Sequence, residues 1–275
     1  MKKIMICFFV TGVFMMTGLP HAHSQIGQQF EGFNLQGYTD GGDKAWDVQG
    51  DTADVMPETI AITNVDANQY GEVDVNIKAK TGVINKQSGD IQLDKDVVVT
   101  SASGSRLTTD RLQWQKEKDL VNTDDKVVIT DKGMVARGRG LEAHPGLKTA
   151  KLDDEVVVEV TPDDNATSGD TVTITCDGSL EIDQKINLAV FHENVVAVQN
   201  DRTLKADKMD VYFDPVSKTI DRVVCIGNVV IIQGENKTYA EKAVYNGKEQ
   251  KFILTGRPKL ILVTDGEGGL GDLPK

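Results

Sequence analysis

Residues 227–240 read GNVVIIQGENKTYA, and this stretch decides the fold. The four apolar residues at 229–232 are all β-branched, which suits the pleated surface of a strand. The polar triplet Gly234-Glu235-Asn236 follows, and a second run then returns through Tyr239. Gly and Asn are typical of tight turns. The stretch therefore predicts a strand, a turn and a returning antiparallel strand.

The same pattern recurs along the chain. Valine-rich or Leu/Ile runs begin about 30 to 40 residues apart, at 97–99, 127–129, 156–158, 195–196, 229–232 and 260–262. Most are introduced by a polar pair: Lys95-Asp96, Asp125-Lys126, Asp154-Glu155, Glu193-Asn194 and Gly227-Asn228. One such unit cannot bury its apolar face alone, whereas stacked units can. The repeat predicts an elongated body with an apolar interior.

Between these runs, apolar and polar residues alternate with a period of two, as in residues 74–79, 170–176 and 207–213. Polar turn signals separate the strands at 86–90, 116–119, 214–218 and 246–248. No stretch of the mature chain shows a helical period. The fold class is therefore all-β, with short strands in a sandwich, barrel or solenoid of sheet.

The N-terminal segment 1–24 has the features of an export signal. Lys2 and Lys3 precede an uncharged apolar run, 4–19, and Pro20 ends it ahead of the small residues Ala22 and Ser24. We expect a cleaved signal peptide, with an uncleaved inner-membrane anchor as the alternative. Either one places the rest of the chain outside the cytoplasm.

The remaining chain divides at its longest break, residues 161–170 (TPDDNATSGD). We predict one β half over 30–160, a loop or boundary at 161–170, and a second β half over 171–263. The Gly-rich residues 264–275 are expected to form a loose tail.

Composition excludes several functions. The net charge is −12, and no basic stripe is present that could bind nucleic acid. This charge would not recruit an anionic lipid, so burial of the lipid's apolar part would have to do so.

No residue pattern indicates an enzyme, a metal site or a cofactor. His144 and His192 have no His or Cys partner at ligand spacing, and no nucleotide-binding or nucleophile motif occurs. The oxygen-rich group Asp163, Asp164, Asn165 and Asp170 could hold calcium, but a polar linker is the favoured interpretation. Cys176 and Cys225 could form a disulfide in an oxidising compartment, although two small buried strand residues are favoured.

Small and β-branched residues are expected to face inward from the strands. An open stack of sheet would leave an apolar trough wide enough for acyl chains, while the same pattern also suits a narrow packed sandwich. The candidate lining residues are Ile77, Ala79, Leu107, Thr109, Ile174, Cys176, Leu204, Ala206, Met209 and Val211.

The repeat resembles a known family. Residues 193–199 (ENVVAVQ) with 203–209 (TLKADKM), and 227–234 with 239–243 (YAEKA), are similar to the OstA/LptA signature. Residues 41–54 (GGDKAWDVQGDTAD) resemble the opening of LptC. The resemblance implies a twisted, slightly open antiparallel β-jellyroll. Because the chain is longer than the usual LptC, it suggests a fused form with C-terminal OstA-like repeats.

The same resemblance implies a role in the periplasm. Such proteins carry lipopolysaccharide from an inner-membrane ABC transporter toward the outer membrane, with acyl chains in the interior and neighbouring jellyrolls joined edge to edge. They have no catalytic activity. A secreted structural or adhesive β-solenoid without a lipid ligand remains the alternative, because the repeat alone fits it equally well.

Overall fold

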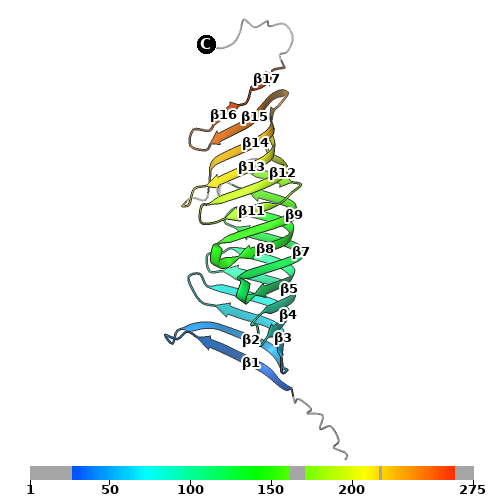
Figure 1. The fold of residues 1–275 in the computed structure, drawn as a ribbon, viewed down its shortest axis with the longest axis vertical. Helices are drawn as coiled ribbons and strands as arrows, with labels where there is room; N and C mark the ends of the chain where they lie inside the picture. The colour runs from blue at the N-terminus through cyan, green and yellow to red at the C-terminus, as the bar shows by residue number, and fades with distance from the viewer. Residues whose placement is uncertain (1–26, 162–170, 217–218, 264–275) are drawn as a thin grey trace, which may run out of the picture.

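The computed structural model describes residues 27–161, 171–216 and 219–263, which form one antiparallel sheet of 17 strands with two short 3-10 helices. The stack is long and twisted (Figure 1). Its elements are β1 (Gln28–Tyr38), β2 (Lys44–Val55), β3 (Thr59–Gln69), β4 (Val75–Asn85), β5 (Ile91–Ser101), β6 (Arg106–Gln115), η1 (Lys116–Lys118), β7 (Leu120–Asp131), β8 (Met134–His144), η2 (Pro145–Leu147), β9 (Thr149–Val160), β10 (Val172–Cys176), β11 (Leu180–Asp183), β12 (Leu188–Gln199), β13 (Arg202–Phe213), β14 (Ile220–Gln233), β15 (Asn236–Asn246), β16 (Lys251–Thr255) and β17 (Lys259–Ile261).

Strands pair largely in chain order, each antiparallel to the next. Two places differ. β10 and β11 together pair along the length of β9, so that two short strands take the place of one long strand. β16 and β17 share β15 in the same way at the C-terminal end.

Most long strands bend at a bulge near their middle. The pairing skips between Asp94 and Val97 in β5, between His192 and Val195 in β12, and between Ile226 and Val229 in β14. Several of the skipped residues have positive φ, such as 66° at Lys95 and 64° at Glu193. A bulge bends its strand and increases its twist. The pairs Lys95-Asp96, Glu193-Asn194 and Gly227-Asn228, which introduce three of the apolar runs, are therefore bends within strands.

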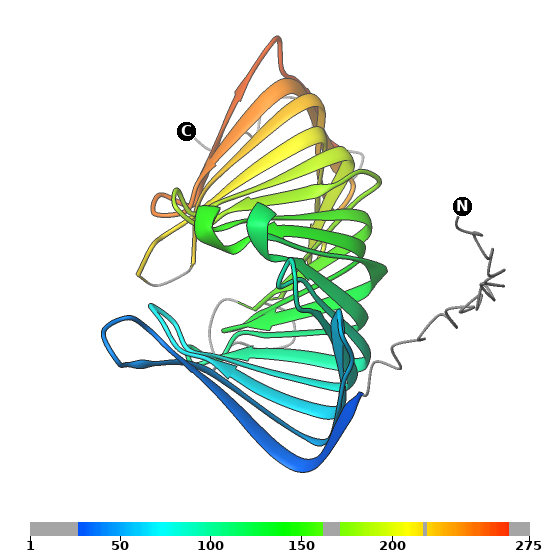
Figure 2. The ribbon, with the colours of Figure 1, turned by 60° about the horizontal axis from the view of Figure 1, so that its bottom comes forward.

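The bends divide the sheet into two walls that meet at a common apex (Figure 2). Wall A contains residues 97–101 of β5 and 195–199 of β12. Wall B contains residues 91–94 of β5 and 188–192 of β12. Strand halves that pair with these belong to the same wall.

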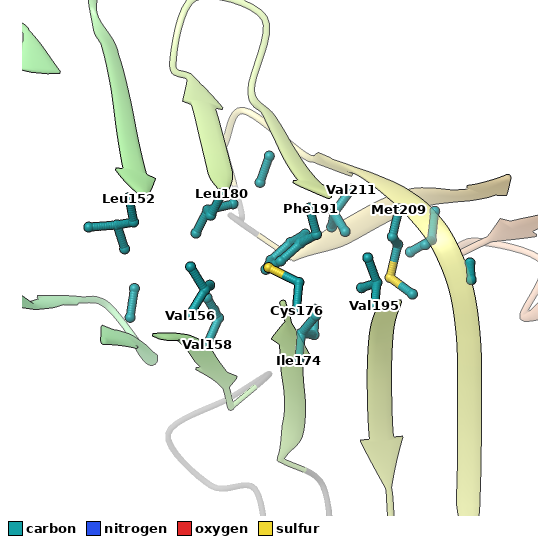
Figure 3. Close-up of a cluster of buried hydrophobic side chains, with 14 of the residues drawn as sticks. Leu152, Val156, Val158, Ile174, Cys176, Leu180, Phe191, Val195, Met209 and Val211 are labelled. Atoms are coloured by element: carbon teal, nitrogen blue, oxygen red, sulfur yellow. The ribbon is translucent and has the colours of Figure 1, made fainter. Parts of the chain in front are cut away.

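Side chains from the two walls face each other and form the core. Leu152, Leu180 and Phe191 of wall B lie opposite Val156 and Cys176 of wall A (Figure 3). Full burial of a Val, Leu or Phe side chain contributes roughly 1.5–3 kcal/mol, so this packing holds the walls together.

The core consists of two clusters. One spans strands from β2 to β6, between Ala53 and Leu112, and the other spans strands from β7 to β15, between Val127 and Ala243. Their boundary coincides with a gap in the β6–β7 pairing. Between the paired residues Thr108–Val128 and the next pair, Gln113–Asn122, residues 109–112 of β6 and 123–127 of β7 are not paired with each other. The bulge between β12 and β13 leaves far fewer residues unpaired. We call this gap the seam.

The predicted all-β antiparallel jellyroll is confirmed. None of the helices in the described ranges is long and apolar enough to cross a membrane. The predicted export segment 1–24, nearly all of the 161–170 boundary, including the Asp163, Asp164, Asn165 and Asp170 group, and the tail 264–275 lie outside the described residues.

Candidate functional site

The apex of the space between the walls is filled by buried side chains. Cross-strand register places one row on each wall. The wall A row is Val65, Ala79, Val97, Thr109, Val127, Val156, Cys176, Val195, Ala206 and Val229. The wall B row is Ala53, Ile62, Leu93, Leu112, Leu141, Leu152, Leu180, Phe191, Met209, Cys225 and Ala243. No member of either row is more than 7% exposed, so the apex is a packed core.

Farther from the apex the inward side chains are still apolar. Between β8 and β14 several of them remain buried: Ala136, Val158, Val160, Ile174, Ala189, Val211 and Val223. The others are only partly buried. On wall A these are Val48, Ala67, Ile77, Val99, Leu107, Ile129, Leu204 and Ile231. On wall B they are Ile60, Ile84, Ile91, Val121, Ala143, Ala150, Ile182 and Tyr245. The walls therefore form an apolar groove that is closed at the apex, accessible toward the turns near both ends of the stack, and packed more deeply around β9 and β10, where burial reaches Val160. We call this space the groove.

The groove is most exposed at the two ends of the stack. At the N-terminal end, Trp46 is 43% exposed on the inward face of β2, in register with Gly37 of β1. At the C-terminal end, Phe252 and Leu260 are 37% and 59% exposed. Large apolar side chains left in water at an open end are typical of a surface that binds something.

The structure places all ten predicted lining residues on the inward face. Seven are buried in the core: Ala79, Thr109, Ile174, Cys176, Ala206, Met209 and Val211. The other three, Ile77, Leu107 and Leu204, lie in the partly buried rows that an incoming ligand could reach.

Sequence reasoning missed most of wall B. Among the largest fully buried side chains are Phe191, Leu152 and Leu180, and none of them was a candidate. The valine runs drew attention to wall A, which supplies every candidate except Met209 and Val211. The alternation of Leu180 and Ile182 with acidic residues was the available signal.

Two surface hollows lie outside the groove. One, of about 380 Å³, is on the outer face of wall B and is lined by residues that include Glu142, His144, Lys151 and Glu181. A smaller one, of about 250 Å³, lies on the outer face around Lys78. Because the apex is packed, a ligand between the walls would occupy the open outer part of the groove, or would displace core side chains by spreading the walls.

Reactive chemistry is not apparent in the described part of the chain. No group of three His, Cys, Asp or Glu residues there could hold a metal ion. Cys176 and Cys225 are free and buried, as the favoured interpretation of the sequence predicted. Burial raises the pKa of the Cys176 thiol to about 11 and that of Cys225 to about 12, so neither is a nucleophile near neutral pH.

Comparisons with known proteins give two consecutive family matches. Residues 19–160 match the family model described as lipopolysaccharide-assembly, LptC-related, and residues 174–268 match the model described as LptA/(LptD N-terminal domain) LPS transport protein. No curated protein matches the chain significantly.

A solved structure also matches the chain. It is titled the crystal structure of LptH, the LptA homologous periplasmic component of the conserved lipopolysaccharide transport device from Pseudomonas aeruginosa. The two are 15% identical, and the alignment covers 69% of this chain and 95% of that chain with a TM-score of 0.20. A TM-score this low does not establish a similar overall shape.

Proposed function

This chain belongs to the LptC-related family of lipopolysaccharide-assembly proteins, and from that premise we propose that it holds lipopolysaccharide acyl chains in the groove and passes them along the stack. The direction of transfer would be from an inner-membrane ABC transporter toward the outer membrane. The protein would act in the periplasm as a bridge component without catalytic activity.

One observation carries the proposal: the apolar inward face continues across the junction between the two family matches. β9 lies in the LptC-related match. It pairs with β10, within which the LptA-like match begins, and with β11, which lies inside that match. The second core cluster extends from Val127 to Ala243 and so spans both segments. An acyl chain leaving the first segment would meet no polar barrier at the junction.

The two ends of the stack supply edges for partners. β1 pairs only with β2, and β16 and β17 pair only with β15, within the described ranges. Unpaired strand edges accept another strand by backbone hydrogen bonding. We propose that other OstA-like jellyroll proteins or the transporter's periplasmic parts add to these edges. The division into halves at 30–160 and 171–263 remains a proposal.

The alternative is a secreted structural or adhesive β-solenoid without a lipid ligand. The repeat alone would support it, but two lipopolysaccharide-transport family matches in succession favour transport. The two proposals differ in whether a lipid contacts the inward face.

Photo-crosslinking tests this directly. A photoreactive residue at Ile77, Leu107 or Leu204 would point into the groove without displacing the packed apex. The neighbouring residues Lys78, Thr108 and Lys205 face outward on the same strands and serve as matched controls.

We expect crosslinks to lipopolysaccharide from the three inward positions in cells and none from the outward ones. Equal crosslinking from both faces, or crosslinking only from outside, would contradict the proposal. Mass spectrometry of lipid that copurifies with the full chain provides an independent check.

A further inference from the structure

The groove has two lips of different charge. Lip A consists of the turns at the free ends of wall A, and lip B of the turns at the free ends of wall B. The turns of lip A carry one described lysine, Lys132, and the acidic residues Asp40, Asp43, Glu72, Asp74, Asp201 and Glu235, while the cations Lys44, Arg106 and Arg202 begin the strands beside these turns. Lip B carries the lysines Lys86, Lys116, Lys118, Lys148, Lys185 and Lys248. A chain with a net charge of −12 thus has a row of cations along one side of its apolar groove.

Lip B also contains carboxylates, but several of them are directed at the turn backbone. Asp90 Oδ1 accepts a hydrogen bond from Lys116 N at 3.0 Å, and Asp119 Oδ2 accepts one from Gly146 N at 2.8 Å. Asp214 Oδ1 accepts one from Val216 N at 2.9 Å. Glu58, Glu117 and Glu249 complete the acidic residues of these turns. Because Asp90, Asp119 and Asp214 accept hydrogen bonds from backbone N–H groups of the turns, they are not directed at the lysine ammonium groups.

Four of the lysines are exposed and form no ion pair with a described carboxylate: Lys86, Lys116, Lys118 and Lys185. Lys86 Nζ donates to Met56 O at 3.3 Å, and Lys118 Nζ donates to Gln115 Oε1 at 2.8 Å, so both bind neutral acceptors. Lys148 and Lys248 instead have acidic partners, Glu72 and Asp221. The first four are therefore the cations on this lip that can accept an anionic partner.

We infer that these four lysines bind the phosphate groups at the head of the lipopolysaccharide whose acyl chains lie in the groove. The inference rests on the proposed function and adds an orientation to it. The head would sit over lip B, because the turns of lip A are mostly acidic and lip B offers the unpaired lysines. An ammonium group is a compact charge that binds phosphate without a fixed geometry, which suits a ligand that must move.

The spacing of the lysines favours movement along the lip. Successive lip B turns are two strands apart, on the order of 10 Å. The Debye length at physiological ionic strength is about 8 Å, so the fields of neighbouring turns overlap. A phosphate leaving Lys86 would therefore be attracted by Lys116 and Lys118 on the next turn. Lys185 lies two turns farther on, beyond Lys148, which is paired with Glu72.

The test uses the full chain with all four lysines changed to glutamine: K86Q, K116Q, K118Q and K185Q. The probes are detergent-dispersed lipid A carrying its phosphates and the same lipid A after chemical dephosphorylation. Binding is followed by fluorescence of a labelled lipid, in low salt and again in high salt.

A matched control removes the same charge elsewhere. Lys80, Lys126, Lys205 and Lys242 are exposed and face away from the groove. Their change to glutamine gives the same net charge as the lip variant, so long-range repulsion is equal in both.

We expect the lip variant to bind phosphorylated lipid A about tenfold more weakly than the unmodified protein, and dephosphorylated lipid A equally well. The control variant should lose less than twofold for either lipid. In high salt, the lip variant and the unmodified protein should bind phosphorylated lipid A with the same affinity. Competition by millimolar inorganic phosphate alone should be weak, because free phosphate lacks the acyl chains.

Three results would overturn the inference. They are equal losses in the two variants, an equal loss for the dephosphorylated lipid, and full displacement by inorganic phosphate, which would mean that the lysines bind free anions. If the unmodified protein binds neither lipid, the proposed function itself fails. If it binds both lipids equally, only the role of lip B fails.

Discussion

Lys148 Nζ lies 3.1 Å from Glu72 Oε1, and this ion pair joins the two lips of the groove. Glu72 is in the turn between β3 and β4 on lip A, and Lys148 follows η2 on lip B. Their side chains are 81% and 46% exposed. The pair connects strands of the first core cluster to strands of the second without passing through either core.

Because both partners are in water, their coupling should be small. A double-mutant cycle with Glu72→Gln and Lys148→Gln should give about 0.2–1 kcal/mol in urea unfolding at low ionic strength. In 1 M salt the coupling should vanish. Pairing Glu117→Gln with Lys148→Gln provides the control cycle. A coupling well above this range would mean that the lips are held together more firmly than an exposed ion pair allows.

Asp47 should make stability depend on acid pH. It is 5% exposed, pairs with Lys44, and accepts hydrogen bonds from Asn68 Nδ2 at 2.9 Å and Tyr70 Oη at 2.8 Å. The hydrogen bond from Lys44, and then those from Asn68 and Tyr70, lower the pKa of this carboxyl to about 2, from 3.8. The resulting stabilisation of the folded state is fully present at pH values above the pKa of Asp47 in the unfolded chain. It is lost as the pH falls from about 4 to 2.

The Asp47→Asn variant should be about 1–3 kcal/mol less stable at pH 7 in urea unfolding. The difference from the unmodified protein should shrink as the pH falls from 4 to 2.5. Asp43→Asn, at an exposed position of the neighbouring turn, should change stability little at any pH. If Asp47→Asn lowers the free energy of unfolding by the same amount at every pH in this range, its effect comes from packing and not from the charge of Asp47.

The seam between β6 and β7 should open more easily than other parts of the sheet. Residues 109–112 and 123–127 are not paired with each other across it. Amide hydrogens that face the seam should exchange faster than those at the β12–β13 bulge, because fewer hydrogen bonds must break. Hydrogen exchange with mass spectrometry would detect this. Equal protection at both places would show that the seam is no weaker.

Thr109 at the seam offers a stability test. Its side chain is 6% exposed, and Oγ1 has no hydrogen-bond partner among the described residues. Thr109→Val removes this hydroxyl at nearly constant volume and should stabilise the protein by about 1 kcal/mol in chemical unfolding. Thr108→Val, on the outward face, is the control and should have a smaller effect. A loss of stability at Thr109 would indicate that the hydroxyl is bound after all.

The two core cysteines should be inert in the folded protein. Cys176 and Cys225 are buried, and burial holds the pKa of each thiol above the usual range, so almost no thiolate forms at pH 8. We expect no labelling by a thiol reagent in native buffer and complete labelling of both in guanidinium, located by peptide mapping. An introduced Ser103→Cys, on an exposed turn, should react at once. A Cys176–Cys225 disulfide, or rapid native labelling, would refute this prediction.

Some of the site could be read from the sequence because a strand alternates its side chains between two faces. The alternation around Ile77, Leu107 and Leu204 assigned each of them to an inward face. The repeat of the valine runs indicated that units stack. Wall B was largely missed. Leu152 and Leu180 lie in shorter and more polar contexts than the valine runs, and Phe191 ends an apolar run, 188–191, that is not part of the valine repeat. The bulge pairs were recognised as a repeated feature, but not as bends.

The amino-acid order by itself determined the strands, their pairing with chain neighbours and the face on which most side chains lie, because these follow from local contacts with a period of two. Tertiary structure alone decided that the strands bend into two walls, that the core breaks at β6–β7, and that Glu72 meets Lys148. The bend depends on backbone geometry at positive φ, and the meeting of the lips depends on twist accumulated over several strands. The polar pairs at the bends are visible in the sequence, but their alignment into one apex and the meeting of the lips depend on how many strands stack together, which no short stretch of residues encodes.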